Sequence, residues 1–290
     1  MTSAEQGPVV AGFDGSAQAR RAIGWAAREA MSLGRRLLIV TALPTPVPDL
    51  VFTPVSAPVP DVFSEDVVRE QAEKELAAVA ADCGQRWPDL EVATRLEQGR
   101  LAEVVDDGAG LLVVGASGRS ALTRALLGST SADVVHHHER TVVVRGENTA
   151  GKVVVGVDGS ERGGHAVAFA FDFAARHGRE LVAVHAWADL PLDSLSPVRT
   201  WDYDWEQLKA GSEAVLEEAL APHRKAHPDV DVRQLVSFDG PAHALIEEAA
   251  DAALLVLGSH GRGAVRRALL GSVSHAVLYH AHCSVAVIRG

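Results

Sequence analysis

The chain has 290 residues, enough for about two domains, and its 47% hydrophobic and 22% charged residues are typical of a soluble globular protein. The 27 Lys and Arg against 38 Asp and Glu give a net charge of -11. That charge argues against a general nucleic-acid binder or a protein of anionic membrane surfaces, which need a dense basic face. No signal-peptide pattern, no apolar run of ~18 residues and no disulfide framework occur, so we expect a cytoplasmic protein.

Strands and helices are expected to alternate along the first half. The β-branched run at residues 9–14 predicts a buried strand that ends at Asp14-Gly15-Ser16, and a helix over 17–33 follows until Gly34 ends it. The other expected elements are strand 37–42, helix 64–83, strand 92–96, a short helix after Gly99, strand 111–114, a helix after Gly128-Ser129 and a closing strand over 142–144.

The second half of the chain repeats the first. Residues 7–42 align with 151–186 at an offset of 144 and share 15 of 36 positions. Residues 111–131 align with 254–274 at an offset of 143 and share 14 of 21. We therefore expect two copies of one fold. The expected domains are residues 1–146 and 151–290, joined by the polar linker 147–150.

This alternation predicts an α/β fold in each half. Consecutive strands joined through helices form parallel β-α-β units, and near-continuous apolar strands indicate a sheet covered on both faces. Each half is thus predicted to be an open, doubly wound, Rossmann-like domain. Such domains bind ligands beyond the carboxyl ends of their strands. The loops after Asp14 and Gly115 both follow strand ends, so they face one crevice if their strands are neighbours.

Two glycine-rich loops, residues 115–129 and 258–272, share the spacing G-x2-G-x9-G-S. The first two glycines of each loop allow a tight turn and close approach of a ligand. The last Gly-Ser pair opens a helix whose N–H groups and dipole attract an anion, and Ser129 and Ser131 would add hydroxyl donors. Residues 115–131 and 258–274 contain arginines and no acid. The loops predict one phosphate site per half; the alternative is that the glycines only make turns and the serines only cap helices.

Asp14 and Asp158 stand at the end of the first strand of each half. Each carboxylate is suited to accept a hydrogen bond from a ribose hydroxyl, or to partner a metal bound to phosphate. The alternative is an Asx turn or a helix cap, and one residue can do both. Neither a P-loop nor a complete G-x-G-x-x-G fingerprint follows the first strand.

Together, VVAGFDGS (9–16), VVVGVDGS (153–160) and the two loops resemble the universal stress protein family, in its ATP-binding branch. The resemblance covers residues 7–146 and 151–290, as in a tandem-domain member. It implies in each domain a flavodoxin-like, five-stranded parallel sheet of order 3-2-1-4-5 and one ATP, with or without Mg²⁺. The nucleotide-binding residues expected in the first half are Gly12, Asp14, Ala42, Gly115, Gly118, Arg119, Gly128, Ser129 and Thr130. Those expected in the second half are Gly156, Asp158, Ala186, Gly258, Gly261, Arg262, Gly271, Ser272 and Val273.

The first half departs further from the family pattern than the second. Ala116-Ser117 stands where the family more usually has Ser-His, as Ser259-His260 does in the second half. The interval from Gly99 to Gly115 is also two residues shorter than that from Gly240 to Gly258. The second site is therefore the more secure prediction.

Three further features complete the sequence. The Pro-rich residues 43–63 and Trp-rich residues 187–205 either border the adenine pocket or form surface loops. No metal site is expected, because His136-His137-His138, His280, His282 and Cys283 lack metal-ligand spacing. The histidines are expected at solvated helix ends, and Cys283 is expected to be buried at the start of the closing strand. The closing strands 142–144 and 285–288 are expected to be exposed edges. The resemblance implies that such strands pair, and in a tandem chain these two could pair with each other and make an internal pseudo-dimer; a homodimer is left open.

Three functions fit this pattern. The first is a stress-response or regulatory protein that binds ATP and acts through nucleotide-dependent conformation or partner binding. The second is a slow ATP-hydrolysing enzyme that uses Asp14 or Asp158 with Mg²⁺. The third is an interaction module in which the nucleotide is structural. No catalytic constellation is recognisable, so no catalytic residue is assigned; the stress role comes from the resemblance alone.

Overall fold

The computed structural model of the chain describes residues 7–44, 65–105, 108–116, 127–146, 150–186, 205–261 and 270–289. The chain divides into two compact units, residues 1–138 and 139–290. Most of the Pro-rich and Trp-rich segments lies outside the described residues. Three predicted nucleotide-binding residues do so as well: Gly118, Arg119 and Arg262.

Unit 1 contains a parallel sheet of four strands in the order β3-β2-β1-β4. Helices connect consecutive strands, as the alternation of the sequence predicts. Its elements are β1 (Val9–Gly12), α1 (Ala17–Leu33), β2 (Leu37–Leu43), α2 (Glu65–Arg86), β3 (Val92–Gln98), α3 (Leu101–Val104), β4 (Leu111–Gly115) and α4 (Ser129–His137).

Unit 2 repeats this arrangement and adds two strands. Its order is β8-β7-β6-β9-β10-β5, parallel throughout except for β5, which runs antiparallel to β10. Its elements are β5 (Arg140–Val144), β6 (Val153–Gly156), α5 (Glu161–His177), β7 (Leu181–Ala186), α6 (Trp205–Ala226), β8 (Val232–Ser237), α7 (Pro241–Glu248), β9 (Leu254–Gly258), α8 (Ser272–His280) and β10 (Ser284–Ile288). The predicted α/β class is confirmed.

Local signals set the ends of the first helix in each unit. The Ser16 hydroxyl accepts a hydrogen bond from the Ala19 N–H (3.1 Å) and caps α1. Gly34 ends α1 in the left-handed conformation, at a φ of 63°. In the same way, Ser160 caps the start of α5 and Gly178 ends it. Each of the two helices therefore spans 17 residues.

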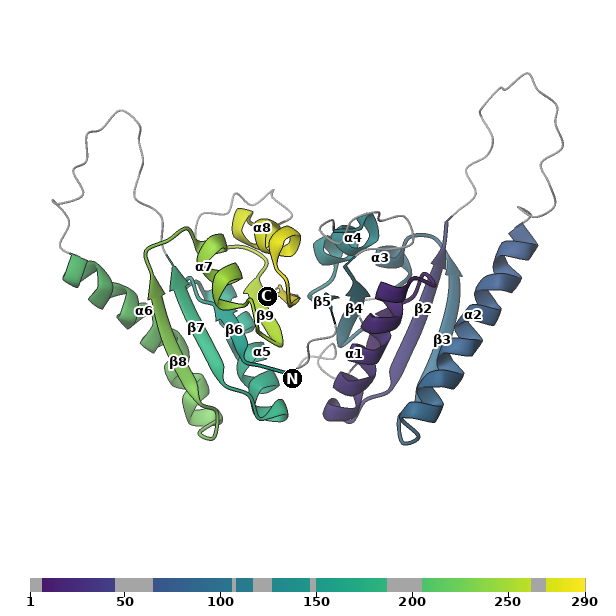
Figure 1. Cartoon of the computed structure of the whole chain (residues 1–290), viewed down its shortest axis with the longest axis horizontal. Coiled ribbons are helices and arrows are strands. Elements are labelled where there is room, and N and C mark those ends of the chain that lie inside the picture. Colours follow the sequence, from purple (N-terminus) through teal and green to yellow (C-terminus); the bar gives the residue numbers. More distant parts are fainter. Residues whose placement is uncertain are drawn as a thin grey trace, which may run out of the picture. The chain divides into compact units, whose positions relative to one another are not determined.

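Helices cover both faces of each sheet (Figure 1). In unit 1, α1 packs on β1 and β4 and α2 on β2 and β3, while α3 and α4 pack against each other. Strands β1, β4, β6 and β9 are almost wholly buried, as expected for central strands covered on both sides. Strands β1 and β6 end two residues earlier than predicted, at Gly12 and Gly156, so Asp14 and Asp158 stand in the loops beyond them.

The two closing strands, expected to pair, lie side by side in unit 2. Val143 is opposite Val285 in the antiparallel register, and both are fully buried. The Ser284 hydroxyl accepts a hydrogen bond from the Arg145 N–H (3.2 Å), which fastens the end of β5 to the start of β10. Strand β5 thereby covers the β10 edge, which would otherwise expose unpaired backbone groups. Cys283, just before β10, is buried as expected.

Among the described helices, none combines the length and the apolar character needed to cross a membrane.

Candidate functional site

Asp158, at the strand end of unit 2, is partly buried, and only one of its two carboxylate oxygens accepts hydrogen bonds from described residues. Asp158 Oδ1 accepts hydrogen bonds from the Ser160 N–H (3.0 Å) and the Ser160 hydroxyl (2.8 Å). Asp158 Oδ2 is buried and has no hydrogen-bond partner among the described residues. A buried acceptor without a donor costs free energy. Asp158 is therefore both an Asx-turn residue and a carboxylate with one oxygen still available to a donor.

The loop after β9 closes over this carboxylate. A Cβ atom on Gly261 would lie 3.1 Å from Asp158 Oδ2, so the absence of a side chain allows this close approach. A Cβ on Gly271 would lie 3.4 Å from the Ser259 carbonyl oxygen and 3.6 Å from the His260 Cα. The structure thus brings Asp158, Gly261 and Gly271 to one place, the carboxyl end of the unit 2 sheet.

A glycine that the sequence analysis did not select explains where Asp158 lies. A Cβ on Gly163, in the first turn of α5, would lie 2.5 Å from Asp158 Oδ1. In unit 1 the equivalent cap donor is Ala19, which carries that Cβ. Asp14 is exposed, and its Oδ1 accepts a hydrogen bond only from the Ser16 N–H (2.9 Å) among the described groups. The aligned repeats already show this difference between the two sites, as Ala19 in the first and Gly163 in the second.

The second half of each glycine-rich loop returns the chain to the strand end. In unit 1 the Gly128 N–H donates to the Ala116 carbonyl oxygen (2.7 Å), and in unit 2 the Gly271 N–H donates to that of Ser259 (2.8 Å). Gly128 and Gly271 are the N-cap residues of α4 and α8, and within the described residues no side chain caps either helix. The first N–H groups of both helices are thus held beside the end of the central sheet.

A serine in each of these helices has a structural role. Ser131 donates to the Gly115 carbonyl oxygen (2.6 Å), and Ser274 donates to that of Gly258 (2.7 Å). Ser131 is predicted to donate to phosphate, but its hydroxyl proton is used to join α4 to β4. The residues left at the start of the helices are Ser129 and Thr130 in unit 1 and Ser272 and Val273 in unit 2.

Several predicted glycines are required by packing. A Cβ on Gly12 would lie 2.5 Å from Leu101 Cδ2, and one on Gly156 would lie 2.8 Å from Leu257 Cδ2. Gly115 meets α1 directly, since its Cβ would lie 2.8 Å from the Gln18 carbonyl carbon. These positions need glycine whether or not a ligand is present.

Ala42 and Ala186, two of the predicted nucleotide-binding residues, lie at the carboxyl ends of β2 and β7. Ala42 is the second-last residue of β2, opposite Glu97 of β3, and Ala186 is the last of β7, opposite Ser237 of β8. Both are partly exposed at the carboxyl ends of their strands. Next to Ala186, the buried His185 bonds through Nδ1 to the Val157 carbonyl oxygen (2.6 Å). This contact links the end of β7 to the residue before Asp158.

The histidine runs form no metal centre within the described part of the chain, where no group of three or more candidate ligands converges. His137 Nδ1 lies 2.7 Å from the Asp133 carbonyl oxygen and 3.5 Å from Asp133 Oδ1. His138, expected at a solvated helix end, is instead buried. The expectation of solvent exposure was wrong for His138 because the chain turns inward there to enter β5.

Comparisons with known proteins agree with this architecture. The model of the universal stress protein family matches residues 7–145 and 149–289. A universal stress protein of Mycolicibacterium smegmatis is 36% identical over 301 residues, covering 100% of this chain and 99% of the relative. Universal stress protein Rv2005c of Mycobacterium tuberculosis is 36% identical over 304 residues, covering 98% of each chain.

A solved structure of similar fold extends over the whole chain. The crystal structure of a universal stress protein from Archaeoglobus fulgidus matches with a TM-score of 0.70 at 18% identity, covering 98% of this chain and 99% of that one. At this identity the likeness concerns the fold. The family model and the full-length relatives carry the assignment: this chain belongs to the universal stress protein family.

Proposed function

We propose that the chain is an ATP-binding regulatory protein of the stress response, with one nucleotide site at the carboxyl end of each sheet. Its two domains are residues 1–146 and 151–290, and the second site is the stronger. The buried Oδ2 of Asp158, which has no hydrogen-bond partner among the described residues, carries the proposal. A ribose hydroxyl would supply the donor that this oxygen lacks, and the gain would come from satisfying a buried charged acceptor.

The rest of the proposed site surrounds that oxygen. Gly261 leaves room for close approach to the carboxylate, and Gly271 places the start of α8, which no described side chain caps, beside the same loop. Backbone N–H groups at a helix start bind phosphate well because the helix dipole favours negative charge there. Ala186 at the end of β7 supplies backbone groups for the adenine. Mg²⁺ is compatible with the site but is not required by it.

Unit 1 offers a weaker version of the site. Asp14 is exposed to solvent, whereas Asp158 is partly buried. A ribose hydroxyl would therefore displace water from the Asp14 carboxylate and would not supply a hydrogen bond to a buried oxygen. In the part of the chain that the structure describes, no side chain caps the start of α4, as is true of α8 in unit 2. We therefore propose two sites of unequal affinity, with ligand occupancy setting conformation or partner choice.

Calorimetric titration of ATP into the full chain tests this proposal. Asp158→Asn should lower the affinity of the tighter site about tenfold, the effect of one hydrogen bond to a charged group. Asp14→Asn is the matched control and should leave that site unchanged. Failure of the wild type to bind ATP or ADP at millimolar concentration would overturn the proposal, as would equal effects of the two variants.

Two further measurements complete the test. Gly271→Val should abolish binding at the second site, since a branched side chain would cover the start of α8 while its Cβ meets only ordinary contacts. Mass spectrometry of small molecules released from the purified protein would identify the bound nucleotide. Phosphate release that disappears in an Asp14→Ala/Asp158→Ala variant would favour the slow hydrolase over the regulatory protein.

A further inference from the structure

His185, the second-last residue of β7, is a buried histidine to which the proposed nucleotide site gives no task. It is 7% exposed, and its Nδ1 lies 2.6 Å from the Val157 carbonyl oxygen. A carbonyl oxygen only accepts hydrogen bonds, so Nδ1 carries a proton and donates it. The neutral ring is therefore the Nδ1–H tautomer, and its donor is directed to the residue before Asp158.

Val157 follows the last residue of β6, and two contacts with β7 hold it. Its N–H donates to the Val184 carbonyl oxygen (2.9 Å), which continues the backbone ladder one residue beyond the end of β6. Its carbonyl oxygen accepts from the His185 side chain. A peptide group is planar, so a fixed Val157 carbonyl also fixes the N–H and the Cα of Asp158. The two contacts thus set the direction in which the chain leaves the sheet.

The place of the Asp158 carboxylate depends on that direction. The hydrogen bonds from Ser160 to Oδ1, at 3.0 Å and 2.8 Å, are local, since they join residues two apart. The His185 bond instead joins the loop to a neighbouring strand. His185 is also next to Ala186, the residue assigned to the adenine. The bond therefore sets how Oδ2, the oxygen assigned to the ribose, lies relative to the end of β7.

Unit 1 has a threonine at the matching position. Thr41 of β2 aligns with His185 at the 144-residue offset of the repeat. The Phe13 N–H donates to the Val40 carbonyl oxygen (2.8 Å), so the last bond of the backbone ladder is kept. Thr41 Oγ1, however, is buried and has no hydrogen-bond partner among the described residues, which include Phe13. Within those residues, a side chain of the neighbouring strand holds the strand-end loop in unit 2 alone.

We propose that His185 is a positioning residue of the second nucleotide site, which holds Asp158 at the distance from Ala186 that one adenine nucleoside spans. This role rests on the proposed function, because that function assigns the ribose to Asp158 and the adenine to Ala186. A nucleoside that meets both residues at once gains from a fixed spacing, since less order has to be imposed on binding. An inorganic polyphosphate, which would contact only the start of α8, gains nothing from it.

Calorimetric titration of ATP into His185→Leu, made in the full chain, tests this role. Leucine fills a similar space without a donor, and the affinity of the tighter site should fall about fivefold, the effect of one neutral hydrogen bond. Binding of inorganic tripolyphosphate should stay unchanged. His185→Asn should restore most of the ATP affinity, because asparagine Nδ2 stands where Nδ1 does. His185→Gln should not, because its donor lies one bond further out.

A double-variant cycle separates positioning from a general loss of structure. If His185 acts through Asp158, His185→Leu should add little to the roughly tenfold loss expected of Asp158→Asn. Losses that multiply, to about fiftyfold, would overturn the proposal, as would equal ATP affinities of His185→Leu and the wild type. Thr41→Val removes the matching hydroxyl of unit 1, so it is the control and should leave the tighter site unchanged.

NMR of the free protein gives a readout that needs no ATP. Nitrogen spectra of the imidazole should show Nδ1 of His185 protonated, and the Asp158 amide resonance should move in His185→Leu and return in His185→Asn. If the wild type binds no ATP, the proposed function fails while these shifts are still expected. If the wild type binds ATP and His185→Leu binds it equally well, only the role of His185 is contradicted. An Asp158 resonance that is the same in all three proteins would contradict it as well.

Discussion

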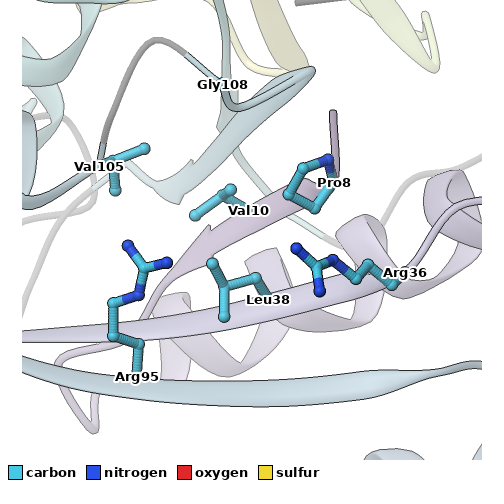
Figure 2. A pocket seen from close by; sticks show the side chains of 7 residues that line it. All are labelled: Pro8, Val10, Arg36, Leu38, Arg95, Val105 and Gly108. Carbon is cyan, nitrogen blue, oxygen red and sulfur yellow. The ribbon is translucent and has the colours of Figure 1, made fainter. Parts of the chain in front are cut away.

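The two units share one backbone plan but differ in the side chains at both ends of their strands. At the amino ends, unit 2 encloses Glu248 between Lys152 and Arg233, while in unit 1 Arg36 and Arg95 line a cavity (Figure 2). The strand pairings that create the two places are the same. Duplication has therefore preserved the fold through its apolar strands and varied the side chains that stand at the strand ends.

At the carboxyl ends of the strands, the two units differ by the methyl group of Ala19, which unit 2 lacks at Gly163. Gly163 lets the Asp158 carboxylate lie against the first turn of α5, where a Cβ would be 2.5 Å from Oδ1. Ala19 occupies that position in unit 1, and Asp14 is exposed. Burial of one aspartate and exposure of the other follow from this exchange, and so does the expected inequality of the two nucleotide sites.

The largest effect is expected from removing the acid at the centre of the unit 2 network. In Glu248→Ala, Lys152 and Arg233 would face each other without the carboxylate between them. The Glu248 and Lys152 side chains are only 16% and 19% exposed, so the loss should approach that of a buried pair, about 3 kcal/mol of unfolding free energy. Urea denaturation of the full chain, with hydrogen exchange of peptides from β6 and β8, measures it.

The matched control for this change is Glu247→Ala on the same helix. Glu247 is 67% exposed and lies 3.5 Å from His243, so its removal should cost less than about 0.5 kcal/mol. If both variants lose the same stability, the network contributes nothing specific. Burial raises the pKa of Glu248, but its pairs with Lys152 and Arg233 outweigh this and lower it. The network's contribution should therefore be present at neutral pH and be lost as the pH falls through that lowered pKa.

A smaller effect should distinguish the two strand-end glycines. Gly115→Ala would place a Cβ 2.8 Å from the Gln18 carbonyl carbon, so the backbone of α1 would have to move, at a cost of about 2 kcal/mol. Gly258→Ala would meet only ordinary contacts, at 3.5 Å and 3.7 Å, and should change stability by less than about 0.5 kcal/mol. Thermal unfolding of both variants makes the comparison, and equal melting temperatures would contradict it.

The comparison of the two units shows which features could be predicted from the sequence and which could not. Ser16 and Gly34 act on their own helix, so the ends of α1 could be predicted from a local pattern. The internal repeat likewise revealed two copies of one α/β fold. The role of Gly163 could not be predicted, because it depends on a carboxylate that approaches from another element. The cavity was equally hidden, since Arg36 and Arg95 come together only through the pairing of β2 with β3.

The smallest expected effect concerns the two cysteines, one in each unit. Burial raises the pKa of the Cys283 thiol to about 11, against the opposing influence of the nearby Arg145. Burial also raises the pKa of Cys83, with Asp82 adding to the rise and Arg86 opposing it. At pH 8 about one Cys283 thiol in a thousand would then be ionised, against roughly a quarter in an unfolded chain. Both thiols should therefore react slowly in the native protein.

Iodoacetamide labelling at pH 8, followed by peptide mass spectrometry, measures these rates. Cys283 should react at least about 100-fold more slowly in the native protein than in urea, because both its ionisation and its access are reduced. Its raised pKa stabilises the fold below the ordinary thiol pKa, and this contribution should be lost as the pH rises towards 11. Cys283→Ser should remove the larger part of the alkaline dependence, and Cys83→Ser should remove the smaller part. Fast native labelling of Cys283 would show that β10 opens readily, and the pairing of β5 with β10 would then give little protection to the end of the chain.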